Sequence, residues 1–172
     1  MKPTVEYELS KEKYLGYIFH HQYNVKQAWY TYLSKVCKNL PYDKDDIMNR
    51  INTHDESKIT KEEFEPYRKY FYQIEGEERN ENEFNKAWEH HYMNNDHHPE
   101  YWIDKDGRVQ EMKLEAMLEM LCDWIAMSIQ FHSNPIEWYE NAIKTKEIVL
   151  HENTNLKVKM ILDNPIIKNS IF

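Results

Sequence analysis

The residues of this chain that could do chemistry are histidines and aspartates. His54 and Asp55 are neighbours, His21 lies upstream of them and Asp123 lies downstream. Between the neighbours and Asp123 the chain carries two adjacent histidine pairs: His90, His91, His97 and His98. Imidazole and carboxylate groups are the usual protein ligands of Zn, Mn, Fe, Co and Ni. The pattern therefore predicts a site for one or two divalent transition-metal ions.

The elements around these residues must turn the donors inward. Adjacent side chains on a regular helix diverge by about 100°, so we expect His54 and Asp55 where a helix ends. Asp123 lies in an otherwise apolar helical pattern, where an unpaired buried carboxylate is costly and metal coordination is a common remedy. The alternative without a metal ion is a histidine in the core that is hydrogen-bonded to a carboxylate.

The spacing of apolar residues predicts an all-α fold. With only 3 Gly and 6 Pro, the chain has few tight turns for a many-stranded sheet. We expect one domain over residues 1–172, a helical bundle of about six to seven helices. Its core should span about 10–150, with 151–172 a weak helix or tail. The predicted helices cover about 11–39, 43–51, 60–74, 81–94, 110–131 and 135–150.

Two of these helix starts are predicted from capping residues. Ser10 is a plausible N-cap for the first helix, which carries His21 on its inward face. Thr60-x-x-Glu63 fits a capping box at the start of the 60–74 helix. Asp104-Lys105-Asp106-Gly107 predicts a turn.

Composition excludes some functions. Hydrophobic residues make up 41% of the chain, which is typical of a globular protein. A formal charge of −8 argues against sequence-independent nucleic-acid binding, because that needs clustered Lys and Arg. No apolar run is long enough to span a membrane, and no signal-like segment opens the sequence, so we expect a cytoplasmic protein without membrane contact. Cys37 and Cys122 fit that compartment as free thiols.

Three motifs together resemble the HD superfamily of metal-dependent phosphohydrolases. His21 with Val25 four residues on is similar to its early element, His54-Asp55-x-x-Lys58 to the HDxxK form of its dyad, and Leu121-Cys122-Asp123 to its late element. The order and spacing also fit, over roughly residues 14–125. The run from Ala87 to Trp102 also resembles a small uncharacterised family of bacteria and their phages.

The resemblance implies a ligand set and a reaction. His21, His54, Asp55 and Asp123 would hold one ion, and histidines between the dyad and Asp123 would hold a second. One histidine from each pair is expected, because neighbours on a helix cannot both point into one pocket; His91 and His98 are favoured, with His90 and His97 as alternates.

The implied reaction is hydrolysis of a small phosphorylated substrate. Asp55 would bridge or anchor the ions, and Lys58 would hold a phosphate oxygen. By resemblance the substrate is a nucleotide. The spacing of the central histidines and the lack of a Gly-Tyr-Pro element argue against a cyclic dinucleotide.

Two other functions remain open. A mixed-valent di-iron oxygenase of the same superfamily would use the same ligands and the HDxxK motif. A non-catalytic protein that binds a nucleotide or a host factor would need neither hydrolysis nor two ions. The bound metal, oxygen dependence and phosphate release separate these alternatives.

Overall fold

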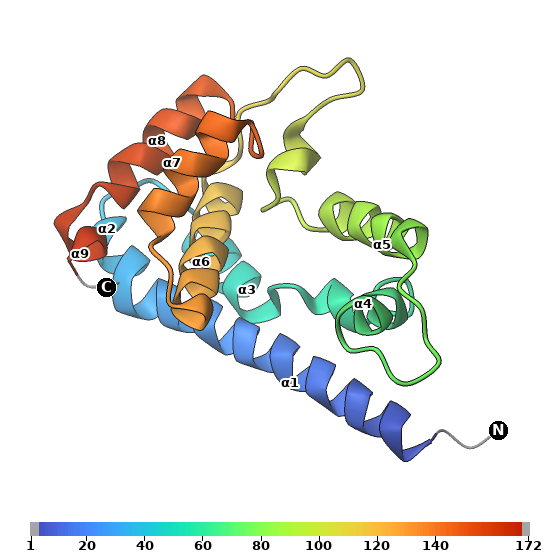
Figure 1. Cartoon of the computed structure of the whole chain (residues 1–172). Coiled ribbons are helices and arrows are strands. Elements are labelled where there is room, and N and C mark those ends of the chain that lie inside the picture. The colour runs from blue at the N-terminus through green and yellow to red at the C-terminus, as the bar shows by residue number, and fades with distance from the viewer. Residues whose placement is uncertain (1–3, 170–172) are drawn as a thin grey trace. The chain divides into compact units, whose positions relative to one another are not determined.

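The computed structural model describes residues 4–169, and their fold is all-α (Figure 1). The expected fold class is confirmed, and the number of longer helices matches the expected six to seven. The helices of eight or more residues in this part of the chain are α1 (Val5–Ala28), α3 (Lys44–Thr53), α4 (Phe64–Phe71), α5 (Glu81–Asn94), α6 (Leu114–Phe131), α7 (Pro135–Thr145) and α8 (Glu152–Leu162). The shorter pieces are a π-helical turn (Trp29–Leu33), α2 (Ser34–Val36), two 3₁₀ turns (Glu56–Ile59 and Pro99–Trp102) and α9 (Pro165–Lys168).

The chain divides into two compact units. Unit 1 consists of Met1–His20 and Asp55–Asn95, and unit 2 of His21–His54 and Asp96–Phe172. The first residues of α1 therefore belong to unit 1 and its last residues to unit 2. The peptide bond between His54 and Asp55 is one of the points at which the chain passes from one unit to the other.

In unit 2 the apolar core surrounds α6, which contacts α3, α7 and α8 (Figure 1). Leu118, Leu121 and Ile125 on α6 are fully buried, because this helix is apolar on nearly every face. The same core includes Val158 and Ile161 of α8.

The segment 151–172 therefore contains a packed helix in its described part. His151 caps α8 by accepting a hydrogen bond from the Asn153 backbone N–H, and Thr154, Val158 and Ile161 recur at helical spacing on the buried side. Residues 170–172 lie outside the described part of the chain.

In unit 1, α4 packs against α5, and the core is aromatic. The rings of Tyr14 and Tyr67 are nearly parallel, with centroids 6.5 Å apart. Arg68 is fully buried and donates two hydrogen bonds to the Glu77 carboxylate and one to the Ser10 hydroxyl. A buried guanidinium needs such partners, because an unpaired charge in the core is strongly unfavourable.

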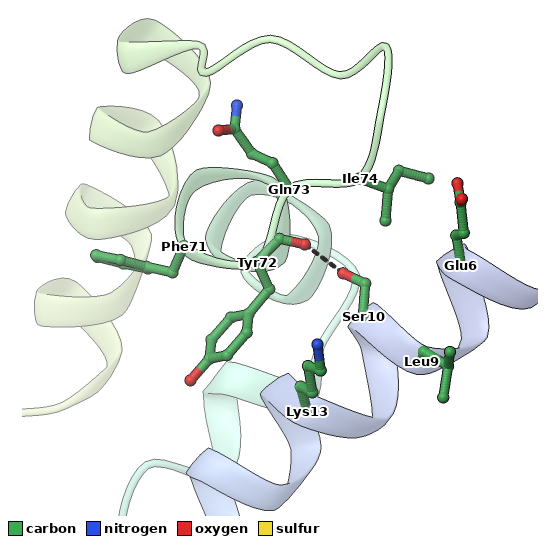
Figure 2. A pocket seen from close by; sticks show the side chains of 8 residues that line it. All are labelled: Glu6, Leu9, Ser10, Lys13, Phe71, Tyr72, Gln73 and Ile74. Carbon is green, nitrogen blue, oxygen red and sulfur yellow. Dashed lines mark hydrogen bonds between the residues drawn. The ribbon is translucent and has the colours of Figure 1, made fainter.

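The prediction that Ser10 caps the first helix is wrong. The helix begins at Val5, and the Ser10 hydroxyl inside it donates to the Tyr72 carbonyl, so its hydrogen bond is tertiary (Figure 2). Beside this contact lies an open groove, which is lined by Glu6, Leu9, Ser10, Lys13, Phe71, Tyr72, Gln73 and Ile74.

Several other boundaries differ from the prediction. α4 is shorter than the predicted 60–74 helix, since it begins at Phe64 and ends at Phe71. α6 begins at Leu114 and not at 110, because the chain before it forms a turn flanked by a bridge between Ile103 and Val109. In that turn the Gly107 N–H donates to the Asp104 carbonyl, and Gly107 has a positive φ of 77°. Among residues 4–169, no helix combines the length and apolar character needed to cross a membrane.

Candidate metal centre

Unit 2 brings together three of the predicted ligands. His21 comes from α1, His54 follows the last residue of α3, and Asp123 comes from α6. Nε2 of His21 lies 3.3 Å from Nε2 of His54. Asp123 Oδ1 is 3.0 Å from the first of these nitrogens and 3.9 Å from the second. Both imidazoles are buried.

These separations suit one small cation. Two donors bound to one ion at about 2.1 Å lie about 3.0 Å apart in octahedral geometry and about 3.4 Å apart in tetrahedral geometry. Two of the three distances fall within that interval and the third is slightly longer. Two imidazoles and a carboxylate also form a donor set that transition metals favour. The arrangement is compatible with a metal site.

The end of α3 orients His54 as the sequence predicts. α3 ends at Thr53, and the backbone of His54 turns to an extended ψ of 128°. Its carbonyl accepts a hydrogen bond of 2.7 Å from the Gln22 side chain on α1. Its Nδ1 lies 2.8 Å from Glu119 Oε1, so its Nε2 is the ring nitrogen nearest to His21.

A charged network lies behind His54. Glu119 Oε1 is 3.3 Å from Nδ1 of His97, and Arg50 donates to Glu119 Oε2 at 3.2 Å. The same guanidinium donates two hydrogen bonds to Asp96, at 2.5 and 3.1 Å. Burial by itself would raise the pKa of Glu119, but hydrogen bonds from the two imidazoles outweigh it and lower that pKa to about 2. Glu119 is therefore a carboxylate at neutral pH.

Unit 1 holds a second group of the predicted residues. Asp55 has a positive φ of 57°, an uncommon backbone conformation for a non-glycine residue and one that is often found at functional sites. Its Oδ2 accepts from the Lys58 ammonium at 2.6 Å, and its Oδ1 is 3.3 Å from His91 Nε2. Asp55 and His91 are both almost fully buried.

Glu63 holds the central histidines of unit 1. Its Oε2 lies 2.8 Å from His91 Nδ1 and its Oε1 lies 2.7 Å from His90 Nδ1. The Ser57 hydroxyl also donates to Oε2, at 3.0 Å. Burial would raise the pKa of Glu63, but these hydrogen bonds and the charge on His91 lower it. Burial also opposes protonation of His91, while the nearby charge of Asp55 raises its pKa.

The remaining predicted ligands have different surroundings. His90 is partly exposed, with one-third of its side chain accessible, whereas His91 is buried. In unit 2, His97 is buried and its ring centroid lies 4.5 Å from that of His54 and 4.2 Å from that of the partly buried His98.

Sequence reasoning missed both glutamates. Glu63 is not the capping-box residue predicted from Thr60, since its carboxylate makes no cap hydrogen bond and contacts the histidines instead. Glu119 lies one helical turn before Asp123 in the apolar pattern of α6, and that spacing was a usable signal.

The fold and the site define an all-α protein with buried histidine and carboxylate clusters. Residues 10–164 match the model of a family described as "Family of unknown function (DUF5662)", and the chain belongs to this family. No curated protein and no solved structure matches the chain.

Proposed function

We propose that this chain is an HD-type metal-dependent phosphohydrolase acting in the cytoplasm on a small phosphorylated substrate, by resemblance a nucleotide. The observation that carries the proposal is the convergence of His21, His54 and Asp123 within 3.0–3.9 Å. They come from three separate helical elements, in the order that the HD superfamily uses. Convergence of three such donors in a buried place is difficult to explain by helix packing alone, because apolar side chains would pack there at less cost.

The proposed ligand set extends this trio by resemblance. Asp55 follows His54 directly in the chain and would complete the first site. His91, whose Nε2 is 3.3 Å from Asp55 Oδ1, and His98 are proposed for a second ion. A divalent ion bound here would polarise the phosphoryl group and lower the pKa of a bound water to near neutrality.

The protein's own side chains have separable roles in this proposal. Asp55 and Asp123 supply negative charge that offsets the charge of a cation. Lys58 cannot ligate a cation, since an ammonium has no lone pair, and its Nζ at 2.6 Å from Asp55 is suited to hold a phosphate oxygen close to the ions. Glu63 restrains His91 through its Nδ1, which directs Nε2 towards Asp55.

Metal content and phosphate release test the proposal together. Protein purified without chelator or nickel resin should contain two transition-metal ions per chain by elemental analysis and should release phosphate from at least one member of a nucleotide panel. His54→Ala should lose metal and activity while keeping most of its helix content by circular dichroism. His98→Ala should retain about one ion, and His132→Ala, at the exposed end of α6, should match the wild type.

Two results would overturn it. A wild type with no affinity for Mn, Fe, Co, Ni or Zn would remove the metal site and with it the hydrolytic mechanism. Bound iron with substrate-dependent oxygen consumption and no phosphate release would replace hydrolysis by oxygenation.

A further inference from the structure

One carboxylate oxygen in unit 2 is shared by two imidazoles. Glu119 Oε1 lies 2.8 Å from Nδ1 of His54 and 3.3 Å from Nδ1 of His97. The other oxygen, Oε2, accepts from Arg50 at 3.2 Å. Glu119 is only 5% exposed and both imidazoles are more deeply buried, so little water competes for these contacts.

The chemistry of the three groups fixes where the protons lie. An ionised carboxylate can only accept hydrogen bonds, and a neutral imidazole carries a proton on one of its two nitrogens. Each imidazole near Oε1 must therefore carry its proton on Nδ1, which leaves the lone pair on Nε2.

We propose that Glu119, anchored by Arg50, is a positioning residue that holds His54 and His97 in the Nδ1–H tautomer, so that Nε2 is the nitrogen through which each imidazole would bind a metal ion. This inference deepens the proposed metal site and rests on it. It favours His97 as a ligand, where the sequence placed it only as an alternate to His98.

The neighbouring imidazole supports this assignment. His54 Nε2 lies 3.3 Å from Nε2 of His21, and two N–H groups cannot face each other at that distance without repulsion. With the His54 proton on Nδ1, its Nε2 accepts from the His21 Nε2–H in the metal-free protein, and a metal ion would replace that proton when both nitrogens bind it. Glu119 thus organises the first site although it is not itself one of the donors.

Arg50 gives the arrangement its rigidity and argues against Glu119 as a ligand. The guanidinium also binds Asp96 through two hydrogen bonds, and Asp96 directly precedes His97. It therefore links α3, which ends before His54, to the segment that carries His97. A cation bound by Glu119 would be repelled by the guanidinium 3.2 Å from its Oε2.

Nitrogen NMR of the metal-free protein identifies the tautomers and does not depend on an enzymatic assay. At mildly alkaline pH, two-bond ¹H–¹⁵N correlation spectra of histidine-labelled wild type should show two imidazoles in the Nδ1–H form, assigned by their loss in His54→Ala and His97→Ala. Glu119→Gln should shift at least one of them to the Nε2–H form, because the amide nitrogen donates where the carboxylate accepted. Glu115→Gln, one turn earlier on α6 and in contact with the Asp43 backbone N–H, should leave both unchanged.

Metal affinity supplies the second readout. Glu119→Gln should weaken Zn²⁺ or Mn²⁺ binding, measured by chelator competition, by about 10- to 100-fold, the usual effect of removing such a hydrogen-bond partner. Glu115→Gln should bind like the wild type.

Three outcomes would overturn the inference. They are an Nε2–H tautomer for either histidine in the wild type, unchanged metal affinity in Glu119→Gln, and a metal-bound spectrum in which Nδ1 of either histidine is the ligating atom. The wild-type spectrum decides even if the variant does not fold. A protein with the predicted tautomers and metal affinity but no phosphate release would contradict only the proposed hydrolysis.

Discussion

Acid should destabilise the metal-free fold through Glu119. Burial raises the pKa of this carboxyl, but the hydrogen bonds from His54 and His97 lower it from its ordinary value of 4.5 to about 2. A pKa that is lower in the folded than in the unfolded state contributes stability that is fully present above about pH 4.5 and is lost as the pH falls towards about 2. The difference corresponds to roughly 3 kcal/mol, at about 1.4 kcal/mol for each pH unit. That is a large fraction of a typical unfolding free energy of about 5–15 kcal/mol.

The measurement is urea unfolding of chelator-treated protein at a series of pH values between about 6 and 2. Between those limits the wild type should lose roughly 3 kcal/mol more unfolding free energy than Glu119→Gln, which has no proton to take up at this position. Other carboxyls with lowered pKa values, such as Glu63 and Glu77, titrate in both proteins and cancel in the comparison. Glu115→Gln is the matched control and should follow the wild type. Identical pH dependence in wild type and Glu119→Gln would refute the reasoning.

Two further substitutions test the groups of unit 1. Lys58→Ala should leave the metal content unchanged and lower kcat/KM about 10- to 150-fold, the value of a charged hydrogen bond to phosphate; wild-type turnover would show that Lys58 does not contact substrate. Tyr67→Phe should leave the unfolding free energy unchanged or raise it by up to about 1 kcal/mol in thermal or urea unfolding, because its buried hydroxyl has no hydrogen-bond partner among residues 4–169. A loss of more than about 1 kcal/mol would mean that this hydroxyl has a partner, such as a buried water.

Helix ends were predicted correctly where local sequence signals marked them. The 81–94 helix was predicted with its observed limits, and the structure shows that the Asn80 side chain caps its start. The end of α3 before His54 also followed from local reasoning, since neighbouring donors diverge on a regular helix.

Tertiary hydrogen bonds explain why the roles of two residues were wrongly predicted from the sequence. Ser10 and Glu63 are residue types that favour helix starts, and both use their side chains for contacts with distant parts of unit 1. Nothing in their immediate neighbours separates a cap from a buried partner. In the same way, the role of Glu119 depends on His97, which lies 22 residues earlier in the sequence.

The buried carboxylates provide the strongest argument that these clusters have a function. Asp55, Glu63 and Glu119 are each at most 5% exposed, and each contacts imidazoles or a cationic side chain. Well-packed apolar residues of similar volume are often as stable as such buried charged pairs or more so, so stability alone does not require them. A site that binds a cation does require them, because the carboxylates orient imidazole nitrogens and their negative charge becomes favourable once a cation is bound. The same groups that make the metal-free protein sensitive to acid are therefore those that we expect a metal ion to stabilise.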